Sequence, residues 1–153
     1  MALPNIFTKE EADKLINRVN SLTKDTQPLW GKMNVAQMLA HSNVTFRYVY
    51  EPEAFKKPKF PMTWVLKAFV KPQVINEKPY PKNGPTGPDF LIKGERDFEA
   101  EKEKMVGFIK RIQAEGASGF DQRESFSFGK LSSEEWNNMF YKHLDHHLRQ
   151  FGV

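Results

Sequence analysis

The sequence predicts an all-α protein with one domain over residues 1–153, an up-down four-helix bundle with long connecting loops and a short extra helix. Four long segments repeat apolar residues at spacings of three and four, which is typical of amphipathic helices. Three of these segments begin with helix-capping signals, and alternation typical of strands is weak throughout. A chain of 153 residues buries a sizeable core without disulfides, and this one contains no cysteine.

The first two helices are expected near residues 8–22 and 34–50. Thr8 and Glu11 have the spacing of a capping box, and Asn34 and Gln37 repeat it. Pro52 ends the second helix. The predicted inward stripes are Ala12, Leu15, Ile16, Val19 and Leu22 in the first helix, and Val35, Met38, Leu39, Ser42, Thr45, Phe46 and Val49 in the second.

The third helix is expected over residues 94–115, with Gly116 as its stop. The fourth begins at Ser132, where Glu135 completes a capping box, and runs almost to Val153. The apolar stripe of the third helix is Phe98, Met105, Phe108, Ile109 and Ile112. One face of the fourth carries Trp136, Phe140, His143, His147 and Gln150 at alternating spacings of four and three.

The segments between these helices are less regular. A short apolar helix is expected over residues 62–70, between Pro61 and Pro72. Residues 74–92 are rich in proline and glycine and predict a long loop, of the kind that often serves function. Residues 119–129 fit either a short extended piece or a packed loop.

Composition narrows the classes of function. The absence of cysteine excludes thiolate ligands and cysteine nucleophiles. The net charge is +4, and Lys56, Lys57, Lys59, Lys67 and Lys71 form a loose basic cluster that could contact phosphate. Elsewhere lysine and glutamate are interspersed, as on a solvated helix face. We therefore keep nucleic-acid association only as a minor alternative.

The N-terminal residues lack the basic and apolar regions of a signal peptide. No apolar run approaches the ~18 residues that a membrane span requires. We expect a cytoplasmic protein without a membrane partner.

The histidines are the strongest sign of chemistry. The chain has four, and three of them lie in the segment His143-Leu-Asp-His-His147. His143 and His147 are four residues apart, so both project from nearly the same side of a helix, one turn apart. This spacing can present two imidazoles to one metal ion. His41, beside the apolar stripe of the second helix, is the candidate third ligand, and three ligands leave a position open for water or substrate.

Other polar residues near the pair have more than one interpretation. His146 projects away from His143 and is expected to be a partly exposed residue or a neighbour of the ligands. Gln150 lies one turn beyond His147, where it either orients a ligand or packs as an amide at the helix end. Asp145 is expected to be solvated, and Trp136 and Phe140 are expected in the core.

Two stretches resemble the DinB/YfiT-like superfamily of four-helix-bundle metalloproteins. They are Gly31-Lys-Met-Asn-Val-Ala-Gln-Met-Leu-Ala-His41 and the fourth helix, from Trp136 through His143-Leu-Asp-His-His-Leu-Arg-Gln-Phe-Gly152. Within the superfamily, the fourth helix is most similar to a subgroup known only as a domain of unknown function. The resemblance implies a divalent metal, nickel, zinc or iron, on His41, His143 and His147.

The resemblance also implies a class of reaction without naming a substrate. Some members of the superfamily are thiol transferases that use low-molecular-weight thiols, so a metal-dependent transferase or hydrolase acting on a small molecule is the leading hypothesis. A non-catalytic module that binds or senses a small ligand is the alternative. Arg47, Tyr48, Tyr80 and Arg149 could bind a polar cofactor or could simply pack. A homodimer is also expected.

Overall fold

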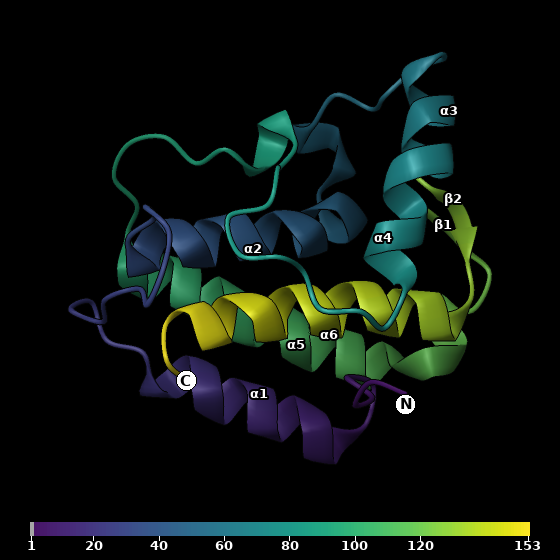
Figure 1. Ribbon diagram of the computed structural model, residues 1–153. Coiled ribbons are helices and arrows are strands. Elements are labelled where there is room, and N and C mark those ends of the chain that lie inside the picture. The colour runs from purple at the N-terminus through teal and green to yellow at the C-terminus, as the bar shows by residue number, and fades with distance from the viewer. Residues whose placement is uncertain (1) are drawn as a thin grey trace.

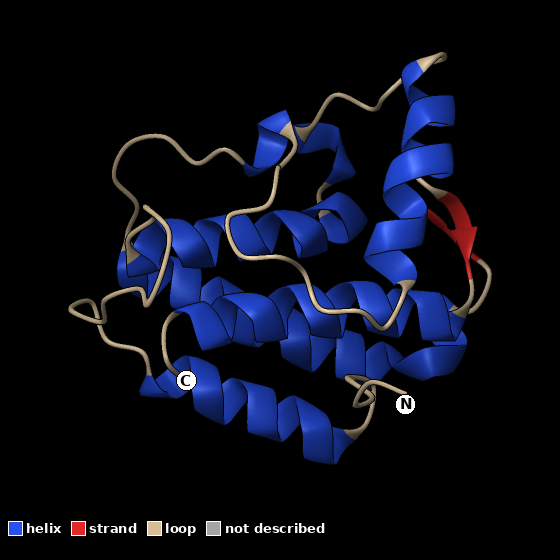
Figure 2. Cartoon of the chain, in the orientation of Figure 1, coloured by secondary structure: helices blue, strands red, loops and turns tan. Residues whose placement is uncertain are grey.

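The computed structural model describes residues 2–153, and its long elements are helices, as the sequence predicts (Figures 1 and 2). The four long helices are α1 (Lys9–Ser21), α2 (Val35–Tyr50), α5 (Phe98–Phe120) and α6 (Ser133–Gln150). Helices α5 and α6 contact each other, and each also contacts α1 and α2. Within residues 2–153, no helix combines the length and apolar character needed to cross a bilayer.

One hydrophobic core joins the long helices. The stripes predicted from the sequence supply much of it, with Leu15 of α1, Leu39 of α2, Ile109 of α5 and Trp136 of α6 each at most 1% exposed. Leu144 and Leu148 of α6, which were not in the predicted stripe, also lie in this core. Trp136 and Phe140 lie in this core, as expected, and their rings pack on Phe120. Burial of these apolar surfaces fixes the position of α2 relative to α6, the two helices that carry the histidines.

Capping explains where the long helices begin. Asn34 and Gln37 form both bonds of a capping box at α2, and Ser132 and Glu135 do so at α6. At α1 only half of the predicted box forms: Thr8 Oγ1 accepts from Glu11 N, whereas Thr8 N donates to Asn5 O. The turn at Asn5 therefore satisfies the donor that the Glu11 side chain was expected to satisfy.

Helix α5 differs from its predicted range at both ends. It starts at Phe98 because the Asp97 side chain caps it by accepting from Ala100 N. The helical backbone breaks at Gly116, at φ 70° and ψ 173°, and one more turn follows as far as Phe120. Glycine tolerates this positive φ, so Gly116 does interrupt the helix where the sequence indicated a stop.

The short helix is longer than predicted. It comprises α3 (Met62–Val65), the π-helical turn η2 (Leu66–Val70) and α4 (Lys71–Ile75). In the π turn Lys71 N donates to Leu66 O, which shifts the bonding pattern just before Pro72. The wider turn accommodates a residue that cannot donate, so the proline does not end the helix. The loop predicted over residues 74–92 is accordingly shorter, and it also contains the 3-10 turn η3 (Pro88–Phe90).

The extended alternative for residues 119–129 is correct. Strand β1 (Arg123–Ser125) pairs antiparallel with β2 (Gly129–Leu131), and Arg123 lies opposite Leu131. The hairpin joins α5 to α6. Another 3-10 turn, η1 (Pro52–Ala54), follows α2.

Candidate metal centre

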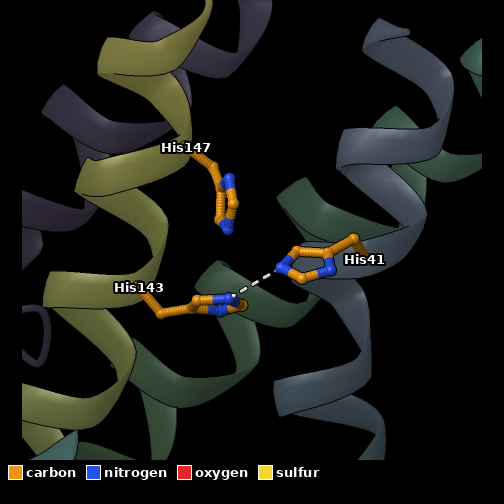
Figure 3. A group of neighbouring side chains, drawn as sticks. All are labelled: His41, His143 and His147. Atoms are coloured by element: carbon orange, nitrogen blue, oxygen red, sulfur yellow. Dashed lines mark hydrogen bonds between the residues drawn. The ribbon is translucent and has the colours of Figure 1, made fainter. Parts of the chain in front are cut away.

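Helices α2 and α6 bring His41, His143 and His147 together. His41 comes from the middle of α2, and the other two project from successive turns of α6 toward it (Figure 3). Their ring centroids are 4.5–5.0 Å apart. The three candidate ligand nitrogens lie within 4.8 Å of one another, so this cluster could hold a metal ion.

The closest pair already has a separation suited to a shared ion. His41 Nε2 and His143 Nε2 are 3.1 Å apart. Two nitrogens that each lie about 2.0–2.1 Å from one ion, at right or tetrahedral angles, are about 2.9–3.4 Å apart. The widest separation between candidate ligand nitrogens in the cluster, 4.8 Å, exceeds this range. At least one imidazole ring must therefore turn toward the other two for all three to bind one ion.

Hydrogen bonds set the tautomers of two imidazoles. His41 Nδ1 is 2.8 Å from the carbonyl oxygen of Phe90, which only accepts, so Nδ1 carries the proton and Nε2 keeps its lone pair. Gln150 Nε2 donates to Trp30 O at 2.9 Å, which orients its amide so that Oε1 accepts from His147 Nδ1 at 2.7 Å. His41 and His147 therefore each present an unprotonated Nε2.

The hydrogen bond with Thr45 allows either tautomer of His143, the third imidazole. The Thr45 hydroxyl lies 3.0 Å from His143 Nδ1 and can either donate or accept. When it donates, His143 Nε2–H can bond His41 Nε2; when it accepts, His143 Nε2 is free for a metal ion. The same contact supports both states, so a change of tautomer at His143 is enough to free its Nε2 for an ion.

Burial keeps the cluster uncharged. Desolvation lowers the pKa of His41, and it lowers the pKa of His143 well below the usual value, with the neighbouring histidines adding to the effect. Burial, followed by His41, lowers the pKa of His147 to about 3, against a smaller opposing contribution from Gln150. Neutral imidazoles are the ligand form for zinc, nickel, copper and iron.

Gln150 and His146, the other two residues singled out near the pair, lie in different surroundings. Gln150 is 4% exposed, accepts a hydrogen bond from His147 Nδ1 and donates one to Trp30 O. His146 is half-buried, with its ring 5.7 Å from Trp30 and 5.8 Å from Tyr80, and it stays outside the cluster. Its pKa is lowered, chiefly by burial.

Asp145 was expected to be solvated, and that expectation is wrong. Its carboxylate pairs with Arg18 of α1 at 2.7 Å and with Arg149 of α6 at 2.8 Å. Arg18 also donates to Val153 O at 2.9 Å. The pair with Arg18 and the bond to Val153 O join α1 to the C-terminal part of α6 and the residues after it.

The loop after α4 supplies Phe90, which the sequence analysis did not assign to the centre, and Tyr80, which it named as a possible binder of a polar cofactor. Phe90 gives its carbonyl to His41, and Tyr80 places its ring 6.3 Å from His143. Lys142 of α6 holds the start of this loop by donating to Gln73 O at 2.6 Å and to Asn76 O at 2.8 Å. The backbone carbonyl of Phe90 leaves no trace in the sequence, whereas Thr45 had one, since it lies four residues after His41.

Fold and site together describe a helical protein with a neutral three-histidine cluster able to hold a metal ion. The chain belongs to the family described as "Protein of unknown function (DUF1569)", which matches residues 4–152. No curated protein and no solved structure matches the chain.

Proposed function

We propose that this protein is a DinB/YfiT-like four-helix bundle that binds one divalent metal ion through His41, His143 and His147. The observation that carries the proposal is the cluster of three neutral imidazoles on α2 and α6, each with Nδ1 in a hydrogen bond. Partners of this kind orient ligand histidines and raise their basicity. The helix order and the two sequence stretches that resemble the superfamily support its assignment.

Three protein ligands leave room at the ion for a small molecule. A divalent ion held this way would lower the pKa of a coordinated thiol or water and so prepare it for attack. Around it, the chain's own residues orient the ligands: Phe90 O for His41, Thr45 for His143 and Gln150 for His147. We propose metal-dependent transfer to or from a low-molecular-weight thiol, or hydrolysis of a small substrate, with nickel, zinc or iron as the ion.

Non-catalytic binding of a small ligand is the second candidate. Aromatic rings flank the cluster, with Phe90 at 5.4 Å from His41 and 5.8 Å from His143 between ring centroids. Such a wall can retain a ligand without turnover. Consumption of a thiol or an electrophile in proportion to metal loading would favour the enzyme, and binding without consumption would favour the module.

The metal content of untagged protein purified without chelators tests the proposal. Mass spectrometry of the wild type should find close to one divalent ion per chain, and the variant His143→Ala/His147→Ala should lose it. His146→Ala is the matched control, because that ring lies outside the cluster, and it should keep the ion. Addition of the bound metal should also raise the melting temperature of the wild type and not of the double variant.

A wild type that stays free of metal after loading with zinc, nickel or iron would overturn the proposal. The histidines would then be packing residues.

A further inference from the structure

Exposed apolar side chains concentrate between residues 60 and 70, on the short helix and just before it. Of the eight large apolar side chains exposed among the described residues, six lie between residues 60 and 70. Phe60 is 82% exposed, Trp64 58% and Phe69 61%, and the Trp64 and Phe69 rings are 6.0 Å apart. The remaining members are Met62, Val65 and Val70. Apolar groups gathered in this way mark an interaction surface, unlike single exposed residues.

The same segment is strongly basic. Residues 54–76 contain five lysines and no aspartate or glutamate. Lys71 pairs with Glu135 at 3.7 Å. Lys56, Lys57, Lys59 and Lys67 are exposed, and none has an ion pair within residues 2–153. Four exposed lysines without an ion pair in the described residues therefore lie in the same stretch of chain as the exposed aromatic side chains.

The segment is anchored at one end and free at the other. Its C-terminal part, α4, packs on α6, where Asn138 donates to Ile75 O at 2.8 Å and Lys142 donates to Gln73 O at 2.6 Å. In the described part of the chain, α3 makes no comparable contact with the long helices. Figure 1 shows α3 standing away from the long helices. Residues 56–70, the projecting segment, thus extend outward on a fixed base.

We propose that the projecting segment docks on the surface of an anionic lipid bilayer. Tryptophan and phenylalanine favour the boundary between headgroups and acyl chains, and the aliphatic side chains gain by entering it. Lysine stems lie along the apolar surface while their ammonium groups reach lipid phosphates. Docking on a surface requires no membrane-spanning helix, so this partner departs from the sequence-based expectation of no membrane contact without contradicting the absence of a span in residues 2–153.

Charge argues against a second copy of the chain as the occupant. In a twofold dimer this surface would face itself, which sets lysine against lysine. A single-stranded nucleic acid would also satisfy the lysines and stack on the aromatic rings. It would give nothing to Met62, Val65 and Val70, which an acyl region solvates well.

Vesicle binding tests the inference with the full-length protein. The wild type should sediment with vesicles of phosphatidylcholine and phosphatidylserine, far less with phosphatidylcholine alone, and less as salt rises. Tryptophan fluorescence should shift to the blue on binding, because Trp64 leaves water, and Trp64→Phe should remove most of the shift while binding persists.

Two variants divide the apolar and basic contributions. Trp64→Ser/Phe69→Ser should weaken binding by at least about tenfold. Lys56→Gln/Lys57→Gln/Lys59→Gln should weaken it by roughly 100-fold, at about fivefold per lysine. Their matched controls are Leu91→Ser, an exposed apolar residue elsewhere, and Lys24→Gln/Lys93→Gln/Lys110→Gln, which removes three exposed lysines elsewhere. All substituted positions are exposed, and circular dichroism checks that each variant is folded.

Three results would overturn the inference. The first is equal binding to neutral and anionic vesicles, or none to either. The second is binding that the control variants weaken as much as the test variants do. The third is a concentration-dependent dimer, or tight binding of a single-stranded oligonucleotide, that the test variants abolish while vesicle binding is absent.

Discussion

Replacing Gly31 with alanine should weaken metal binding from outside the cluster. Gly31 has φ +83°, and a Cβ there would stand 2.6 Å from Gln150 Nε2. The amide would have to move, which breaks its bond to Trp30 O at 2.9 Å and loosens the bond it accepts from His147 at 2.7 Å. Loss of such a partner of a metal ligand typically costs about 10–100-fold in affinity.

The stability cost has two parts. Alanine at this positive φ loses about 1–2 kcal/mol of folding free energy. Each displaced hydrogen bond removes about 0.5–1.5 kcal/mol more. Gly94 is a matched control, because it has φ +76° and no atom within 4 Å of its would-be Cβ. Gly94→Ala should therefore lose only the backbone part and should keep the wild-type affinity.

Zinc affinity can be measured by competition with a chromophoric chelator, and stability by urea unfolding in the presence of excess chelator. Gly31→Ala should bind zinc less tightly than Gly94→Ala and should be the less stable of the two. Equal zinc affinity in the two variants would refute the role assigned to Gln150, even if both variants are destabilised equally.

Two further perturbations follow from burial. Metal-free protein should lose stability as the pH falls below about 6.5, because the unfolded chain binds a proton that the buried imidazole excludes. With its pKa lowered to about 3, His147 alone should reduce the free energy of unfolding by about 2 kcal/mol between pH 8 and pH 5. Urea unfolding at the two pH values measures this loss. Equal stability at both, or a loss that His147→Gln does not reduce, would contradict the prediction. Phe140→Ala should destabilise the fold by about 3–5 kcal/mol, because its ring is 1% exposed and packs in the core. The exposed Phe60→Ala should change stability by less than about 0.5 kcal/mol, and similar values for the two variants would contradict the assignment of Phe140 to the core.

Local signals account for the parts of the fold that were predicted well. The capping boxes at Asn34 and Ser132 place the starts of α2 and α6, because the side chains that satisfy the first turn are near in sequence. The stripes of three and four spacings identify the buried faces. The predictions failed where the hydrogen bonds differ from those that the capping and helix rules assume. The short helix continues past Pro72 because a π turn precedes the proline, and Thr8 N donates to Asn5 O instead of to the Glu11 side chain.

Part of the candidate site was also within reach of the sequence. His143 and His147 share a helix face because four residues make about one helical turn. His41 was the one histidine outside the segment that holds the other three, so its selection as third ligand rested on elimination and on the superfamily resemblance. Asp145 was misjudged since its partner, Arg18, lies on another helix.

The sequence by itself determined the existence of the four long helices, the capping boxes at Asn34 and Ser132 and the pair of histidines one turn apart, because these depend on interactions between residues near in the chain. Only the tertiary structure decided that His41 lies 3.1 Å from His143, that the Phe90 carbonyl sets the tautomer of His41, and that Trp30 orients the amide that holds His147. These contacts join residues far apart in sequence. Core packing brings these residues together. The residue spacing within a single helix does not predict which distant backbone atom its side chains will contact.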